Sequence, residues 1–225
     1  MNETLSKMKK IVLLAVVAVF LSVLEACAYS NGDFQVWNTD VEELKISDKA
    51  KLAFEEEFRW GKSARQFYLS HYDVGYFFDL SKYLNVGGGY RRVYSRSKDK
   101  FRSEDEAYLT ATPSWEIVGF KFEDRSRLEY RYFDYQDDSW RYRNKLTVKA
   151  PWKFTKYAIQ PYLSDEALIK LDDSWHMNEN RFSAGLGATL TKNLKAELYF
   201  MLQNTKNKDK WPCANVLGTK VKLVF

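Results

Sequence analysis

Hydrophobic and polar residues alternate with a period of two along almost the whole chain after residue 29. In segment 120–132 one face carries Phe120, Phe122, Leu128, Tyr130 and Tyr132, and the other carries Lys121, Glu123, Arg125, Arg127, Glu129 and Arg131. Successive side chains of a β-strand point to opposite faces, whereas an amphipathic helix repeats every 3.6 residues. The same alternation recurs at 51–60, 140–152 and 194–203. The pattern therefore predicts an all-β chain.

The alternating segments define a series of predicted strands. They span 33–46, 52–60, 67–80, 84–97, 107–117, 120–133, 140–150, 158–171, 181–190, 194–204 and 216–225. Single-chain bacterial membrane barrels have even strand numbers, and this series is odd. We therefore expect an antiparallel up-and-down β-barrel of 10 or 12 strands, with 12 favoured. In that case segment 33–46 either contains a short extra strand or does not join the wall.

Alternating strands of this kind occur in two settings. In a soluble barrel the apolar face points inward, whereas in an outer-membrane barrel it meets lipid and the charged face lines the interior. The segments are about 10 to 14 residues long, which suits a tilted membrane crossing. Aromatic residues at strand ends, such as Trp60, Tyr132, Trp140 and Trp152, suit interfacial girdles. The pattern favours a transmembrane barrel.

The connections between the segments are predicted to alternate in length. Short ones lie near 47–49, 81–83, 118–119, 151–156 and 191–193, and longer, charged ones near 61–65, 96–105, 134–139, 172–180 and 204–214. Outer-membrane barrels have short periplasmic turns and long external loops. We therefore expect the two sets at opposite ends of the barrel.

The first 28 residues have the layout of a signal peptide. Basic Lys7, Lys9 and Lys10 precede an apolar stretch at 11–24, and Ala26 and Ala28 then satisfy the small-residue rule for cleavage after Ala28. Segment 24–27 also resembles a lipoprotein box, in which Cys27 would be acylated. We expect a signal peptide at 1–28 and a barrel at 29–225.

The last residues of the chain alternate and end on an aromatic side chain. Val221, Leu223 and Phe225 share one face of the final predicted strand. This ending resembles the signal by which the barrel assembly machinery of the outer membrane accepts its substrates. Together with the signal peptide, it predicts export to the outer membrane of a Gram-negative bacterium.

The chain resembles a domain-of-unknown-function family of Gram-negative outer-membrane β-barrel proteins. The resemblance starts at segment 33–38 (DFQVWN) and continues through strand 52–60. It then follows a hairpin from 72–76 (YDVGY) to the glycine-rich segment 87–91 (GGGYR). The family implies a barrel fold for the mature chain but brings no established activity, so it assigns no functional residue.

Composition excludes several other classes of protein. The chain is 45% hydrophobic, 16% aromatic and 29% charged, with a mean hydropathy of −0.49, which rules out disorder and a bundle of transmembrane helices. The net charge of +5 and the basic loops 96–102 and 206–210 could suggest nucleic acid. For an exported protein, solvated loops or contact with lipopolysaccharide and lipids explain them better, so no nucleic-acid partner is expected. Two cysteines form no disulfide framework or metal-ligand spacing, and we expect no metal or cofactor.

The charged faces of the strands are predicted to line the lumen. These residues are Glu55, Glu57, Arg59, Arg91, Glu123, Arg125, Arg127, Glu129, Arg131, Arg141, Arg143 and Lys145. Lumen charges can select ions in a pore, but in a narrow barrel opposite charges can pair and fill the lumen. We expect a non-enzymatic structural or porin-like role in small-solute transport, with a partly plugged lumen.

Two alternatives remain open. His71 and Asp73 share a strand face, so they could act as base and orienting acid in a barrel enzyme that acts on lipid A or peptides. Membership of an interior polar network is the simpler interpretation of this pair. The second alternative is a soluble periplasmic lipocalin-like carrier, in which Phe122, Leu128 and Tyr130 would face a dry core.

Overall fold

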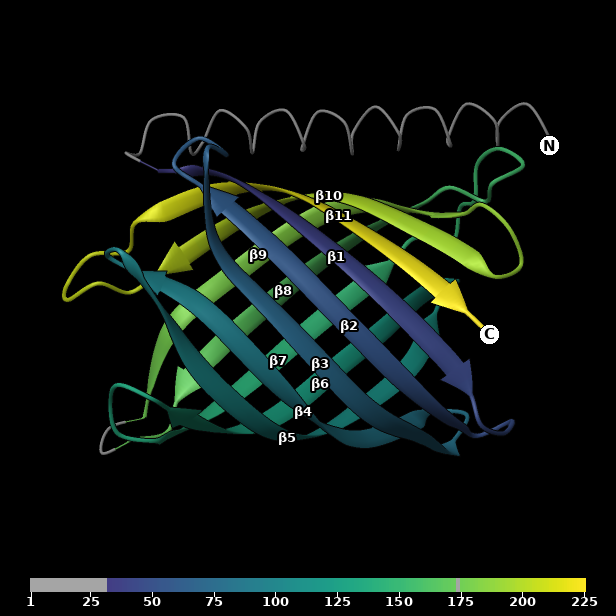
Figure 1. Ribbon diagram of the computed structural model, residues 1–225. Coiled ribbons are helices and arrows are strands. Elements are labelled where there is room, and N and C mark those ends of the chain that lie inside the picture. The colour runs from purple at the N-terminus through teal and green to yellow at the C-terminus, as the bar shows by residue number, and fades with distance from the viewer. Residues whose placement is uncertain (1–31, 173–174) are drawn as a thin grey trace.

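The computed structural model describes residues 32–172 and 175–225, and their regular structure is a single closed β-barrel (Figure 1). Its strands are β1 (Phe34–Lys45), β2 (Ala50–Gly61), β3 (Gln66–Ser81), β4 (Leu84–Ser97), β5 (Lys100–Ile117), β6 (Phe120–Phe133), β7 (Ser139–Lys149), β8 (Gln160–Lys170), β9 (His176–Thr189), β10 (Leu194–Thr205) and β11 (Cys213–Val224). Consecutive strands pair antiparallel. The predicted all-β, up-and-down barrel is confirmed.

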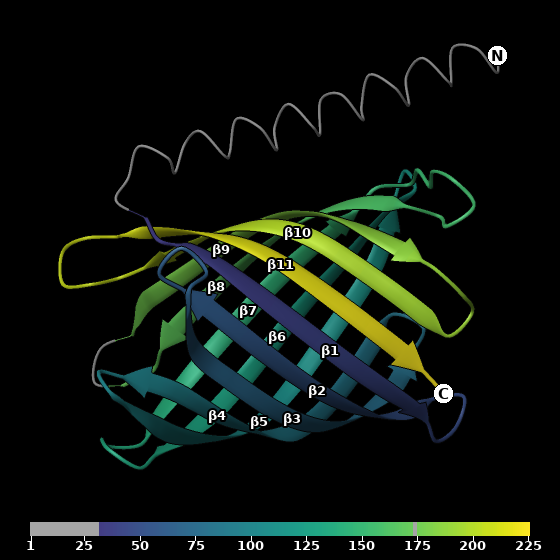
Figure 2. The same cartoon turned by 45° about the horizontal axis from the view of Figure 1, so that its top comes forward.

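The two ends of the barrel carry different connections. At the Phe225 end, the C terminus lies beside the turn between β1 and β2, where Phe225 donates its N–H to Glu43 O at 2.8 Å (Figure 1). The chain enters β1 at the other end, which we call the Asp33 end. There Asp33 accepts hydrogen bonds from the backbone N–H groups of Lys62 and Ser63 at 2.7 and 2.9 Å. Figure 2 shows the steep tilt of the strands between these ends.

The strand count differs from the prediction of 10 or 12, because the described barrel has 11 strands. With an odd number of up-and-down strands, the first and last strands run in the same direction. β1 and β11 accordingly close the wall as a parallel pair, with Phe34 opposite Asn215 and Glu43 opposite Val224. Segment 33–46 therefore forms one full strand of the wall, and the even-number rule does not hold here.

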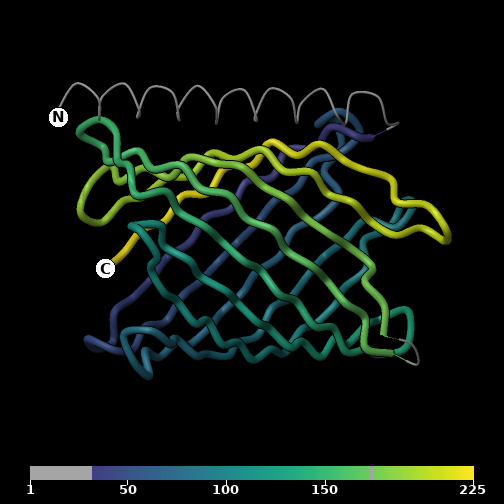
Figure 3. The backbone as a smooth tube through the Cα atoms, turned by 180° about the vertical axis from the view of Figure 1, so that it is seen from behind, coloured from purple at the N-terminus to yellow at the C-terminus, as the bar shows by residue number. Residues whose placement is uncertain are grey.

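The predicted connections alternate between the two ends, but two of their lengths were wrong. Residues 150–159 form a long connection between β7 and β8 at the Phe225 end, where a short turn was expected (Figure 3). The predicted long loop 96–105 is instead a tight hairpin, because Lys98 and Asp99 alone link β4 to β5. Most of its charged residues belong to the ends of β4 and β5, beyond the part of each strand in which apolar residues alternate.

Glycines let aromatic rings lie flat against the inner wall. A Cβ on Gly218 would lie 2.0 Å from Cζ of Tyr199, and one on Gly185 would lie 2.6 Å from Cζ of Tyr162. On β4, a Cβ on Gly89 would lie 2.5 Å from the hydroxyl oxygen of Tyr108. Glycine in a strand commonly marks such a close approach. These rings occupy interior volume that would otherwise be open.

Within the described residues, a small apolar cluster lies inside the barrel near the seam between β1 and β11. Trp37, Met201 and Val216 are buried together, and Tyr199 packs against them. The guanidinium of Arg59 stacks over the Trp37 ring at 3.5 Å. Most of the remaining interior is polar and charged, and this polar part forms the candidate site.

Candidate functional site

The charged side chains point into the barrel and the apolar side chains point out. On β6 the contrast holds between neighbours, since Glu129 is 0% exposed and Leu128 is 38% exposed. Large exposed apolar residues cover the outer wall, including Phe54, Val74, Leu109, Trp115, Leu146, Leu163, Leu186, Leu198 and Leu217. A soluble carrier has the reverse arrangement, with its apolar face inside. The interior of this barrel is therefore the place to look for chemistry.

Towards the Asp33 end, carboxylates and guanidinium groups alternate around the interior. Arg131 binds Glu104, and Arg141 bridges Glu106 and Glu129. Arg143 then donates to Glu129 at 3.1 Å. Buried charges are tolerated when each is paired and hydrogen-bonded. This layer of ion pairs spans the inner face of β5, β6 and β7.

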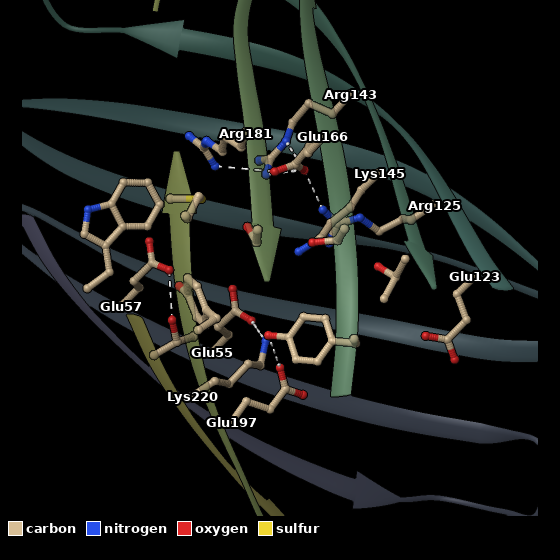
Figure 4. Close-up of a pocket in the computed structure, with 18 of the residues that line it drawn as sticks. Glu55, Glu57, Glu123, Arg125, Arg143, Lys145, Glu166, Arg181, Glu197 and Lys220 are labelled. Carbon is tan, nitrogen blue, oxygen red and sulfur yellow. Dashed lines mark hydrogen bonds and ion pairs between the residues drawn. The ribbon is translucent and has the colours of Figure 1, made fainter. Parts of the chain in front are cut away.

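In the middle of the barrel, one carboxylate gathers three arginines. Glu166 Oε1 accepts hydrogen bonds from Arg125 Nη2 at 2.8 Å and from Arg143 Nη2 at 2.8 Å, and Arg181 Nη1 lies 3.5 Å from its Oε2 (Figure 4). Arg181 also binds Glu179 through Nε at 2.5 Å. Glu166 links β6, β7, β8 and β9, so it joins the two halves of the charged network.

The remaining network lies along β2, β3 and β4. Arg91 Nε donates to Asp73 at 2.9 Å, and its Nη2 lies 3.5 Å from Glu55. Glu57 accepts hydrogen bonds from Thr39 at 2.9 Å and from Arg59 at 2.6 Å. These groups satisfy one another within the wall, as a structural polar network does.

His71 and Asp73 each have other partners within the described structure. His71 Nε2 lies 3.2 Å from Glu55 and Nδ1 lies 3.6 Å from Glu57. Asp73 binds Arg91 and accepts a hydrogen bond from the Tyr108 hydroxyl at 2.7 Å. The two residues share the inner face, but His71 pairs with Glu55 and Glu57 and not with Asp73.

All the residues proposed for the lumen lie on the inner face of the barrel. Arg127 has no hydrogen-bond partner for its Nε and Nη1, and its guanidinium stacks on the Tyr108 ring at 3.9 Å. The network also contains interior charges that the sequence analysis did not select, namely Glu43, Glu104, Glu106, Glu166, Glu179, Arg181, Glu197, Lys220 and Lys222. Glu166 shares one face of the predicted strand 158–171 with Ser164 and Leu168. The alternation of that strand could therefore have identified Glu166 as an interior residue.

A cavity of about 350 Å³ remains in the middle of the interior (Figure 4). Cationic side chains outnumber carboxylates in its lining. The cations are Arg59, Arg91, Arg125, Arg143, Lys145, Lys149, Arg181, Lys220 and Lys222, and the carboxylates are Glu55, Glu57, Glu123, Glu166 and Glu197. Hydroxyl groups of Thr112, Thr147 and Tyr162 also face it. The cavity can hold a small polar solute.

Hydrogen-bonded polar pairs interrupt the apolar outer surface on β6 to β9. Asn144 donates to Asp124 at 2.7 Å, and Asn180 donates to Asp165 at 3.0 Å. Asp40 and Glu56 face outward as register partners on β1 and β2. The outer wall thus carries many exposed apolar side chains, with polar pairs between them at several positions.

The predicted terminal signals fall in different parts of the structure. Val221 and Leu223 point outward from β11, and Phe225 is exposed at the end of the barrel. The expected signal peptide, with Ala26, Ala28 and Cys27, lies outside the described residues. Among those described, no helix is long and apolar enough to cross a membrane, and no group of three or more histidine, cysteine or acidic residues could hold a metal ion.

Comparison with known proteins places the chain in a family without assigning an activity. No curated protein and no solved structure matches it. Residues 34–213 match the family described as "Protein of unknown function (DUF2490)", so the match runs from the first residue of β1 to the first residue of β11. This finding agrees with the expected resemblance to an uncharacterised family. The chain belongs to the DUF2490 family of proteins of unknown function.

Proposed function

We propose that the protein is an integral outer-membrane β-barrel without enzymatic activity, which has a structural or porin-like role in small-solute transport. The observation that carries this proposal is the inverted polarity of the barrel. Leu109 and Leu198 are 70% and 50% exposed on the outer wall, while Glu129 is 0% exposed inside. Exposed apolar surface of this extent is costly in water and favourable in lipid.

The two ends of the chain support export and insertion. The alternating Val221, Leu223 and Phe225 suit recognition by the barrel assembly machinery, and residues 1–28 suit a signal peptide. In this proposal the Phe225 end faces the periplasm of a Gram-negative cell. Lipids and lipopolysaccharide are the partners of the outer wall, and no nucleic acid is involved.

The ion-pair layer supports a lumen that is partly plugged. Arg141 bridges Glu106 and Glu129, and Arg131 binds Glu104, so charged side chains occupy the space that a wide pore would need. A cavity of about 350 Å³ suits a small solute and not a large one. We therefore expect weak, small-ion conductance instead of the steady large current of an open porin.

The alternatives have less support from the geometry. A barrel enzyme would rest on His71 and Asp73, whose described partners are Glu55, Glu57, Arg91 and Tyr108. A soluble carrier would need Phe122, Leu128 and Tyr130 in a dry core, and Leu128 lies on the exposed outer wall instead. The carrier alternative also leaves the charged interior unexplained.

Membrane fractionation tests this proposal. The full-length protein is expected to stay in outer-membrane fractions after a carbonate wash and to change its gel mobility on heating. In planar bilayers, the purified protein is expected to give small currents. Release by carbonate, or identical mobility before and after heating, would contradict insertion. A large, steady current would contradict the plugged lumen.

A further inference from the structure

The cavity contains two facing cations that have only one carboxylate in their row, and that carboxylate also pairs with two other arginines. Arg125 on β6 and Lys145 on β7 are register partners and both point inward, so two like charges face each other across adjacent strands. Like charges in such positions destabilise a sheet. Glu166 on β8 is the register partner of Lys145 on its other side. It is therefore the one carboxylate next to these two cations in the register.

Glu166 cannot neutralise both groups. It already binds Arg143 and Arg181 as well as Arg125. The Arg125 Nε atom has no hydrogen-bond partner, and Lys145 lines the cavity without a hydrogen bond or ion pair among the described residues. Glu123, the nearest carboxylate along β6, is held by Lys121 and Lys149 at 2.8 Å each. An excess of positive charge therefore remains beside the cavity.

Neutral donors complete the surroundings of this pair. Thr147 follows Lys145 on the same face of β7, and Thr112 lines the same cavity from β5. A charged oxyanion accepts hydrogen bonds from guanidinium, ammonium and hydroxyl groups together. The cavity thus offers the donors that such an anion requires.

The exposure of charged interior side chains differs between the two ends of the barrel. The side chains of Lys149 and Arg125 are 34% and 31% exposed, whereas Glu106, nearer the Asp33 end, is 2% exposed. This difference in exposure favours the Phe225 end as the route by which an anion would reach Arg125 and Lys145. This end holds the C terminus.

We propose that the cavity binds a small oxyanion with at least two negative charges, with Arg125 and Lys145 as its main ligands. The inference rests on the proposed function, because it names the solute class that the barrel would handle. Phosphate and small dicarboxylates share this chemistry. A bound dianion would balance the two facing cations and remove their mutual repulsion.

Titration calorimetry of the full-length protein in detergent tests the proposal. Inorganic phosphate is the first probe, and succinate and chloride are the comparison arms. Saturable binding of phosphate or succinate, with none for chloride, is expected. The dianion that binds more tightly shows whether the cavity prefers phosphate or a dicarboxylate. Absence of saturation with both dianions would overturn the proposal.

The variant Lys145→Met tests whether Lys145 binds the anion. Lys153→Met is its matched control, because Lys153 is an exposed loop residue at the Phe225 end of the barrel. Lys145→Met is expected to weaken dianion binding at least tenfold, and Lys153→Met to leave it unchanged. Without added anion, Lys145→Met is expected to unfold at an equal or higher temperature, since it relieves the repulsion with Arg125. Equal binding by both variants would overturn the assignment of Lys145.

Dianion-dependent stability gives a second readout. Phosphate or succinate is expected to raise the unfolding temperature of the wild type but not that of Lys145→Met, because a ligand stabilises only the state it binds. An equal rise in both proteins would contradict the site. Carbonate extraction separates the two proposals: a protein that resists extraction but binds no dianion fails only the further inference, and an extractable protein that binds one fails only the membrane proposal.

Discussion

Two carboxylates on β5 are expected to contribute very differently to the stability of the barrel. Glu106 is buried and lies within ion-pair distance of Arg91, Arg131 and Arg141. Glu116 lies on the same strand, but it is exposed near the Phe225 end. Because a buried pair loses its balance when one partner is removed, the same substitution should have very different costs at these two positions.

Glu106→Gln is expected to lower the free energy of unfolding by about 3 kcal/mol or more, because the arginines around it stay buried without their carboxylate. Glu116→Gln is expected to change it by less than about 0.5 kcal/mol. Urea titrations followed by tryptophan fluorescence in lipid vesicles measure both. Similar costs for the two variants would show that the ion-pair layer does not bear on stability.

Glycine positions allow a steric test of the interior. Gly218→Ala is expected to destabilise the barrel by about 1–3 kcal/mol, because the new methyl group would overlap the Tyr199 ring. Gly187→Ala is the control, since the nearest atom to its Cβ would be 3.9 Å away. The temperature of the heat-induced gel shift reports the difference. Tyr199→Leu should restore stability to Gly218→Ala, and a lack of rescue would contradict the contact.

The closing pair of strands gives a test at the level of elements. Asn38 on β1 and Thr219 on β11 are register partners, and the Asn38 side-chain amide donates to the Thr219 hydroxyl at 3.0 Å. The double variant Asn38→Cys/Thr219→Cys is expected to form a disulfide, because paired strands lie within disulfide reach. Peptide mapping under non-reducing conditions identifies the bond.

A shifted pair is the control for this cross-link. In Asn38→Cys/Leu223→Cys the second cysteine lies four positions further along β11, about 13 Å away. It is expected to stay unlinked. A cross-link in the shifted pair but not in the matched pair would exclude the parallel closure. A barrel with an extra strand between β1 and β11 would cross-link neither pair.

The sequence predicted most strands, but it could not predict how the wall closes. Alternation is a local property, so strands such as β6 and β10 were located within a few residues. Strand pairing across the seam depends on β1 and β11, which lie at opposite ends of the sequence. The predicted count of 10 or 12 strands relied instead on the even strand numbers of known bacterial barrels, and it was wrong here.

The same limit explains which interior residues were missed. Alternation identifies the inner face of a strand once the strand is recognised, as for Arg141 and Arg143. Glu104 was assigned to a loop because the charged ends of β4 and β5 look like loop sequence. The partners of Glu166 come from three other strands, so no local pattern could show that it gathers three arginines.

At the scale of the whole molecule, the large aliphatic residues of the strands and most of their charged residues lie on opposite faces of one wall. Averaging over both faces gives a mean hydropathy of −0.49, which hides an apolar outer surface. A mean value of this kind describes neither face. The central claim is therefore that the outer face contacts lipid and the inner face contacts water and ions.

Spin labels on the two faces test this claim most directly. Single cysteines replace Leu109 and Leu198 on the outer wall and Thr147 in the cavity, and the labelled proteins are reconstituted into lipid vesicles. At Leu109 and Leu198, collisions with oxygen are expected to exceed those with a water-soluble nickel complex, because oxygen concentrates in lipid. The label at Thr147 is expected to show the reverse. Nickel accessibility at Leu109 and Leu198 equal to that of an aqueous loop would contradict the account.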